Sequence, residues 1–286
     1  MQAREEPARV AVMTALPLLF AALIAAESGQ SGPPADPAAP PAREAGAVPA
    51  PSAAVPFDLD AALAKADAAW TERDLPGKLE ELGATLDSAA RSAPTSYVVL
   101  WRQARLIGWR SEDPALEKTE KSRLGKLGWE LGDKARALEP GKVEGHFFSM
   151  VGVGNYSLGI GVFSALAQGI EGKFKERLSR AETIEPNFQA GAIQMSWGRF
   201  YFELPWPKHD AKLSEKYLRE AIARDAVAVR PHVYLGDLLL DEGRKDEARA
   251  AFQHALAIPV VPGQGDPPEQ RRWQAVAKQS LEKLSK

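Results

Sequence analysis

The segment GDLLLDEGRKDEARAAFQHA, residues 236–255, decides which fold class we predict for this chain. Small and large residues stand at fixed intervals of 7, 5, 4 and 3 in it: Gly236, Gly243, Ala248, Phe252 and Ala255. Small side chains at such positions allow two paired helices to approach closely, while Phe252 fills the space between neighbouring pairs. The segment therefore predicts a helical hairpin with its helices at residues 231–242 and 246–258.

Similar hairpins recur along the chain. Alanines near the ends of helix-like segments are separated by 46, 46, 40 and 34 residues: Ala89, Ala135, Ala181, Ala221 and Ala255. The first three are followed five residues later by a proline, at Pro94, Pro140 and Pro186. This pattern is typical of tetratricopeptide repeats. We therefore expect an all-α, tetratricopeptide-like solenoid of helical hairpins over residues 57–260, and a loop with a C-terminal capping helix over residues 261–286.

The composition limits the class of function. The chain has 286 residues, of which 45% are hydrophobic and 26% charged, as is ordinary for a soluble globular protein. Its net charge of −2 supplies no basic field for phosphates, so we expect no nucleic-acid partner. The absence of cysteine excludes disulfides, thiolate catalysis and cysteine metal sites.

The first 56 residues differ in composition from the rest. Residues 10–26 form an uncharged run of 17 that ends in small side chains, so residues 1–26 are predicted to be a signal peptide or, alternatively, an uncleaved N-terminal anchor. Residues 27–56 contain eight prolines and nine alanines, which predicts a disordered linker. We expect a periplasmic or secreted protein that meets the membrane, if at all, only through an uncleaved N-terminal segment.

Residues 145–170 carry no formal charge apart from a neutral histidine. We interpret this stretch as two buried helices that break near Gly159–Gly161, with a transmembrane span as the alternative. Asn155, Gln168 and the many glycines weigh against a span. Small residues recur every four positions and predict close backbone packing along that face: Ser157, Gly161, Ala165 and Gly169.

The segment SWGRFYFELPWP (196–207), followed by KLSEKYLREAI (212–222), resembles the TatT family. These are periplasmic tetratricopeptide proteins, the T-components associated with tripartite ATP-independent periplasmic transporters. The resemblance covers about residues 58–260. It implies a periplasmic accessory protein that docks on a substrate-binding protein and holds a hydrophobic small molecule in an inner cavity. Members of that family are typically lipoproteins, whereas this chain lacks the cysteine that carries the lipid.

Candidate binding residues come from two patterns. The first helix of each pair lines the inner face of a tetratricopeptide array, which in the last unit predicts accessible positions at Arg230, Val233, Asp237 and Leu240. Aromatic residues are dense between 147 and 206, either as core or as the wall of an apolar pocket. The pocket hypothesis selects Met195, Arg199, Phe200, Phe202 and Trp206. Arg199 could orient an acidic head group or pair with Glu203, four residues on.

Neither a catalytic site nor a cofactor site is predicted. The four histidines lack the spacing and the carboxylate partners of a metal site: His146, His209, His232 and His254. The glycines at 152–154 lack the preceding strand and the third glycine of a dinucleotide loop. The chain is thus expected to be a non-enzymatic binding protein, either a transport accessory or a scaffold for protein assembly in the cell envelope.

Overall fold

The computed structural model describes residues 57–285. Within this range the chain forms twelve α-helices, one 3-10 helix and no strand, which confirms the all-α prediction. The predicted signal peptide or anchor (1–26) and the linker (27–56) lie outside the described residues.

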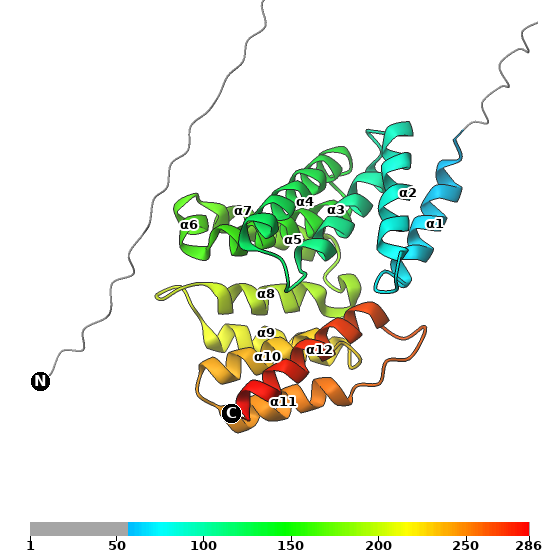
Figure 1. The fold of residues 1–286 in the computed structure, drawn as a ribbon. Coiled ribbons are helices and arrows are strands. Elements are labelled where there is room, and N and C mark those ends of the chain that lie inside the picture. The colour runs from blue at the N-terminus through cyan, green and yellow to red at the C-terminus, as the bar shows by residue number, and fades with distance from the viewer. Residues whose placement is uncertain (1–56, 286) are drawn as a thin grey trace, which may run out of the picture. The chain divides into compact units, whose positions relative to one another are not determined.

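Five helical hairpins stack side by side and a last helix covers the end of the stack (Figure 1). The first two pairs are α1 (Leu59–Thr71) with α2 (Lys78–Ser92), and α3 (Tyr97–Ser111) with α4 (Lys118–Leu138). The third is α5 (Val143–Ile160) with α7 (Ile170–Ile184), with the short α6 (Val162–Ala167) between them. Next come the 3-10 helix η1 (Phe188–Gly191), α8 (Ala192–Glu203) with α9 (Ala211–Arg224), and α10 (Arg230–Asp241) with α11 (Lys245–Ala257). The capping helix α12 (Pro267–Leu284) packs on α10 and α11.

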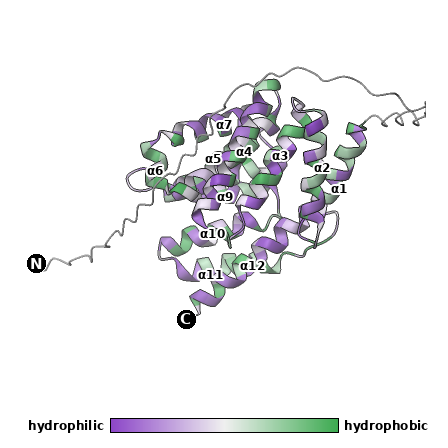
Figure 2. Ribbon diagram, turned by 45° about the horizontal axis from the view of Figure 1, so that its top comes forward, coloured by the Kyte–Doolittle hydropathy of each residue, from purple (hydrophilic) through white to green (hydrophobic). Residues whose placement is uncertain are grey.

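Capping residues set where several helices begin. The carboxylate of Asp58 accepts a hydrogen bond from the Ala61 N–H at 2.9 Å, and Asp266 accepts one from the Glu269 N–H at 3.3 Å. Each satisfies a donor that has no partner inside the helix. These two caps set the start of α1 and of α12. Hydrophilic and hydrophobic residues are mixed along α11 and α12 (Figure 2), as expected for amphipathic helices that bury one face.

The last hairpin packs as its sequence predicts. A Cβ added at Gly236 would lie 2.4 Å from Cε1 of Phe252, so the ring rests directly on the glycine backbone. Phe252 itself is fully buried. The large residue thus occupies space that only a glycine on the partner helix leaves open.

The uncharged stretch forms α5, α6 and the start of α7. The chain turns at Gly161, where φ is 88°, which confirms the predicted break. However, Gly161 and Gly169 contact nothing at the Cβ position, so the predicted four-residue ladder is wrong. The close packing instead uses glycines seven residues apart on α5 that meet α4: Gly145, Gly152 and Gly159. None of the described helices is long and apolar enough to cross a membrane.

Candidate functional site

A cavity of about 560 Å³ lies on the inner side of the stacked hairpins. The first helices of all five hairpins, α1, α3, α5, α8 and α10, contribute to its wall, as expected for the inner face of a tetratricopeptide array. Residues of α6, α7, η1, α9 and α12 and of the loops beside them complete the wall. This volume lies within the range of small-molecule pockets.

Most of the wall is apolar. Many of its large apolar side chains come from the third and fourth hairpins, among them Phe147, Phe148, Met150, Leu166, Phe174 and Phe200. The rings of Phe174 and Phe200 stack with their centroids 4.9 Å apart, joining α7 to α8. Stacked aromatic pairs of this kind add to the packing stability of the wall. The aromatic cluster therefore serves partly as core and partly as cavity lining.

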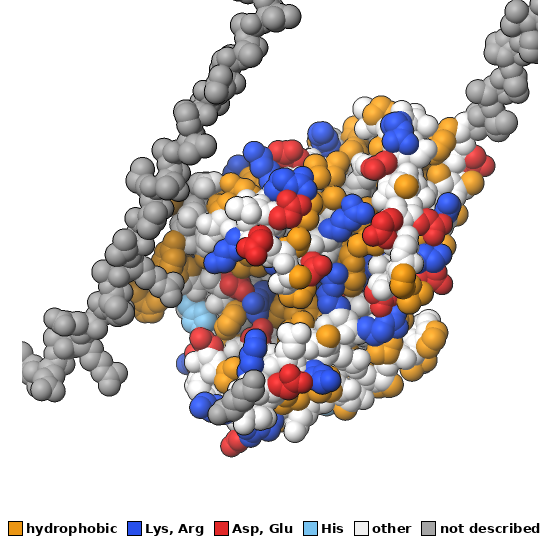
Figure 3. Space-filling model, viewed as in Figure 1, with side chains coloured by type: hydrophobic (Ala, Val, Ile, Leu, Met, Phe, Trp, Pro, Cys, Tyr) orange, Lys and Arg blue, Asp and Glu red, His pale blue; other side chains and the backbone are white. Residues whose placement is uncertain are grey.

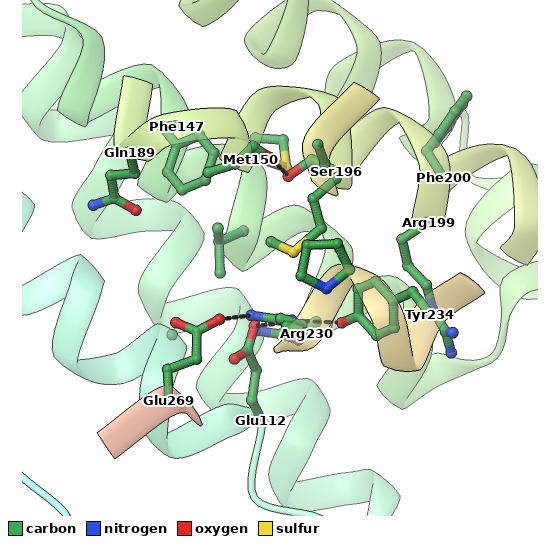
Figure 4. A pocket seen from close by; sticks show the side chains of 18 of the residues that line it. Glu112, Phe147, Met150, Gln189, Ser196, Arg199, Phe200, Arg230, Tyr234 and Glu269 are labelled. Carbon is green, nitrogen blue, oxygen red and sulfur yellow. Dashed lines mark hydrogen bonds and ion pairs between the residues drawn. The ribbon is translucent and has the colours of Figure 1, made fainter. Parts of the chain in front are cut away.

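Arg230 at the start of α10 is the centre of the polar end of the cavity (Figure 4). It lies 2.8 Å from a carboxylate oxygen of Glu112 and 3.5 Å from one of Glu269, and its Nε donates to the Tyr234 hydroxyl at 2.8 Å. Burial alone lowers the pKa of Arg230, but Glu112, Tyr234 and Glu269 outweigh it and raise the pKa. Burial also raises the pKa of Glu269. Three helices are thus tied together around one charge.

Arg199 forms a second charged group beside the first. It lies 2.5 Å from Glu203 on its own helix and 3.0 Å from Asp237 on α10. The predicted pair with Glu203 is present. Burial raises the pKa of Asp237 even though Arg199 opposes the shift. Because both guanidinium groups already have carboxylate partners, this end of the cavity offers no unpaired cation to an acidic head group.

An arginine–tryptophan stack at the first two hairpins contributes Trp70, Arg73, Arg105 and Trp109 to the wall. Trp101, Arg105, Trp70, Arg73, Trp109 and Arg272 alternate in that order, with each guanidinium carbon 3.2–4.9 Å from the neighbouring ring centroid. Cation–π contacts between desolvated groups are individually favourable. Burial lowers the pKa of Arg105 to about 10. Since Arg272 belongs to α12, the stack joins the first half of the chain to the capping helix.

Further contacts cross the same boundary, which we call the seam. Arg73 binds both carboxylate oxygens of Asp266 at 2.8 and 2.7 Å, and Arg271 pairs with Asp74 at 2.5 Å. Arg272 donates to the Trp109 carbonyl at 2.9 Å, and beside the seam Arg230 of α10 pairs with Glu112. Charged side chains thus close the array from its last helix back to its first hairpin. The sequence suggested only a cover over the last repeat.

The structure places part of the predicted binding set in the cavity. Met195, Arg199 and Phe200 line it from α8, and Arg230 lines it from α10. Phe202 does not line it but packs 4.8 Å from the Arg199 guanidinium. Asp237 takes part only through its ion pair with Arg199. Helix α8 is therefore the element for which the sequence prediction and the cavity agree best.

Other members of the predicted set lie elsewhere. Val233 is fully buried between helices, so the expectation that a partner can reach it is wrong. Leu240 is partly buried in the same cluster and does not line the cavity. On α10 the cavity meets Tyr234 instead, one residue or about 100° around the helix from Val233. Trp206 is 88% exposed and also lies outside the cavity wall.

Several residues of the cavity wall were not predicted from the sequence. Gln189 and Ala190 have φ angles of 45° and 47°, and Gly191 follows at 108°, so three consecutive residues with positive φ border the cavity. Such strained backbone is found disproportionately at binding sites. No motif marks this turn, because the strain depends on how η1 meets α8 and α9.

The visible surface shows no extended region of one charge. Basic and acidic side chains are interspersed over the face in Figure 3. Such a surface lacks the basic stripe that follows a phosphate backbone. The glycines at 152–154 lie inside α5, where no phosphate loop can form.

Neither a family model nor a curated protein matches this sequence. Among solved structures, the chain is similar to a thermophilic TPR protein of Thermus thermophilus, with a TM-score of 0.57 and 18% sequence identity. The match covers 78% of this chain and 100% of that one. Together with the stacked hairpins, it shows a tetratricopeptide-like helical repeat fold.

Proposed function

We propose that this chain is a non-enzymatic periplasmic binding protein that holds a neutral, apolar small molecule in its central cavity and acts as an accessory component of a transport system. The cavity carries this proposal, because it combines a suitable volume with a mostly apolar wall. The paired arginines at its polar end favour a neutral molecule over an acid. The sequence resemblance to the TatT family supports the transport role and the docking of a substrate-binding protein.

The cavity is tested by filling it. Ser196 lines the cavity, so Ser196→Trp places an indole inside it, whereas Ser179→Trp adds the same group to an exposed site on α7. We expect the full chain to bind the neutral dye Nile red, and Ser196→Trp to weaken binding at least about tenfold, or about 1.4 kcal/mol. Ser179→Trp should bind like the wild type. Native mass spectrometry should also find a retained apolar molecule.

Two results count against the proposal. One is a wild-type chain that binds no Nile red and retains no molecule. The other is Ser196→Trp binding as tightly as Ser179→Trp, with both variants giving wild-type circular dichroism.

A scaffold for protein assembly is the second candidate. It is favoured by the repeat fold and by two strongly exposed aromatic side chains, Trp206 at 88% and Phe163 at 76%. The loop of Trp206 is held near α6, which carries Phe163, because Lys208 forms an ion pair with Glu171 at the start of α7. Large exposed aromatic residues of this kind are typical of protein interfaces.

Cross-linking in extracts of the native cell separates the two functions. If the chain is a scaffold, the double variant Trp206→Ala and Phe163→Ala should lose a specific cross-linked protein that the wild type captures. Gly172→Ala, which changes an open position on α7, should keep it. If the double variant still captures every protein that the wild type captures, the surface around Trp206 and Phe163 is not the docking surface.

A further inference from the structure

One histidine lies beside two carboxylates that are distant from it in sequence. His209 is in the loop between α8 and α9, whereas Asp241 ends α10 and Glu242 follows it. Both turns lie at the same end of the stacked hairpins (Figure 1). One nitrogen or oxygen atom from each of these three residues lies within 4.8 Å of the other two. The spacing of histidines in the sequence did not reveal this cluster.

The tautomer of His209 suits a metal ligand. Its Nδ1 lies 3.0 Å from the Phe202 carbonyl oxygen, so Nδ1 carries the proton and donates it to that carbonyl. Nε2 is then left with its lone pair, and it is buried without a hydrogen-bond partner among the described residues. Metal-binding histidines usually donate their other ring nitrogen to a carbonyl or carboxylate in this way. The Phe202 ring packs edge-on against the imidazole, with centroids 6.1 Å apart, and helps to fix its orientation.

The two carboxylates are available to a cation. Nearby arginines have other partners: Arg199 pairs with Glu203 and Asp237, and Arg244 pairs with Glu215 and Glu247. Within residues 57–285, neither Asp241 nor Glu242 takes part in an ion pair. They also stand at the carboxyl end of α10, where the helix dipole favours positive charge.

We infer that His209, Asp241 and Glu242 bind one Zn²⁺ ion. An imidazole nitrogen with two carboxylate oxygens suits zinc, whereas Mg²⁺ and Ca²⁺ prefer oxygen ligands alone. Zinc bonds to nitrogen and oxygen are about 2.0–2.2 Å long, so the exposed carboxylates rotate inward to close the site. Three protein ligands leave a fourth position for water. The bound ion joins the α8–α9 loop, which carries the exposed Trp206, to the end of α10.

Calorimetry on the full chain tests the site. The protein is prepared without a histidine tag, treated with EDTA and titrated with ZnCl₂. We expect one Zn²⁺ per chain, and a loss of affinity greater than about tenfold in His209→Gln and in Asp241→Asn. His254→Gln, which changes another histidine, and Asp246→Asn, which changes an exposed acid at the start of α11, should bind like the wild type.

The exposed carboxylates keep the test independent of folding. Should His209→Gln fail to fold, Asp241→Asn and Glu242→Gln alter only exposed side chains and still report on the site. The inference is overturned if the wild type takes up no zinc at millimolar concentration. It is equally overturned if the folded variants at 209, 241 and 242 bind zinc as tightly as the two controls.

Discussion

Helices α4 and α5 pack backbone against backbone, whereas the seam between α12 and the first two hairpins is held by long charged side chains. A Cβ at Gly152 would lie 2.2 Å from the Trp129 nitrogen, and one at Gly132 would lie 2.5 Å from Ser149. The seam has no such fit and relies on arginines such as Arg73 and Arg271. The α4–α5 pair can therefore separate only by unfolding, while the seam can open by breaking a few polar contacts.

The largest expected effect is at the α4–α5 contact. Gly152→Ala places a methyl group against the Trp129 backbone, which cannot yield as a flexible side chain could. We expect the free energy of unfolding to fall by about 3 kcal/mol, as measured by urea denaturation.

Gly172→Ala is the matched control for this change. Its Cβ meets nothing within 4 Å, and its position in α7 favours alanine by about 1 kcal/mol. If Gly152→Ala is as stable as the wild type, the close packing of α4 on α5 is refuted.

A buried charge network strengthens the same region. Asp133 on α4 accepts hydrogen bonds from Ser149 on α5 and from Arg177 on α7. Burial alone raises the pKa of Asp133, but hydrogen bonds from Arg177, Ser149 and Arg136 outweigh it and lower the pKa from 3.8 to about 2. Asp133→Asn leaves the charge of the buried Arg177 uncompensated. It should lower the free energy of unfolding by about 2 kcal/mol at neutral pH. This is less than for a fully buried pair, because Asp133 is partly exposed.

The stability difference between the wild type and Asp133→Asn should depend on pH, because the pKa of Asp133 is lowered in the folded protein. Because the folded pKa is depressed, the stabilisation is present above the unfolded pKa of 3.8 and disappears as pH falls towards about 2. Urea denaturation of the wild type and Asp133→Asn across this range should show their difference shrinking. A constant difference would mean that the Asp133 charge does not contribute.

Substitutions at the seam should lower the global free energy of unfolding less than Gly152→Ala does. Their main effect should be more frequent local opening of α12. Arg73 is buried between Trp70 and Trp109 and pairs with Asp266. Arg73→Met should therefore lower the free energy of unfolding by about 1–2 kcal/mol. Amide hydrogen exchange should increase at the start of α12 while remaining unchanged in α5.

The exposed pair of Arg123 with Glu120 supplies the control for the seam. Arg123→Met should leave exchange in α12 as in the wild type. Equal exchange in Arg73→Met and the wild type would show that Arg73 does not hold the seam closed.

The smallest effect is expected at the outer edge of the seam. Arg271 and Asp74 form a pair in which the arginine side chain is 45% exposed. Arg271→Ala should cost less than about 1 kcal/mol. Thermal unfolding at low and high salt should show this small difference vanish as salt increases. A cost that persists at high salt would contradict a screened surface pair.

Much of the fold was predictable because its signals are local. The capping residues Asp58 and Asp266 satisfy donors within one turn, and Gly236 with Phe252 marks one hairpin. Predictions of inward-facing residues were less successful. On α10 the sequence pattern selected Val233, but Tyr234 faces the cavity. A rotation by one residue depends on how α10 packs against α8, α9 and α12, which local periodicity does not encode.

The sequence by itself determined the helical repeat class and, to within one or two residues, the helix bounds of the last hairpin, since these follow from periodicity and from small residues at close contacts. Only the tertiary structure decided that the array closes on itself through Arg73 and Arg230, that a cavity lies inside, and that His209 meets Asp241. These contacts join residues 32 to 193 positions apart in the chain. Their partners are brought together by the summed rotation from hairpin to hairpin, which no single segment of the sequence specifies.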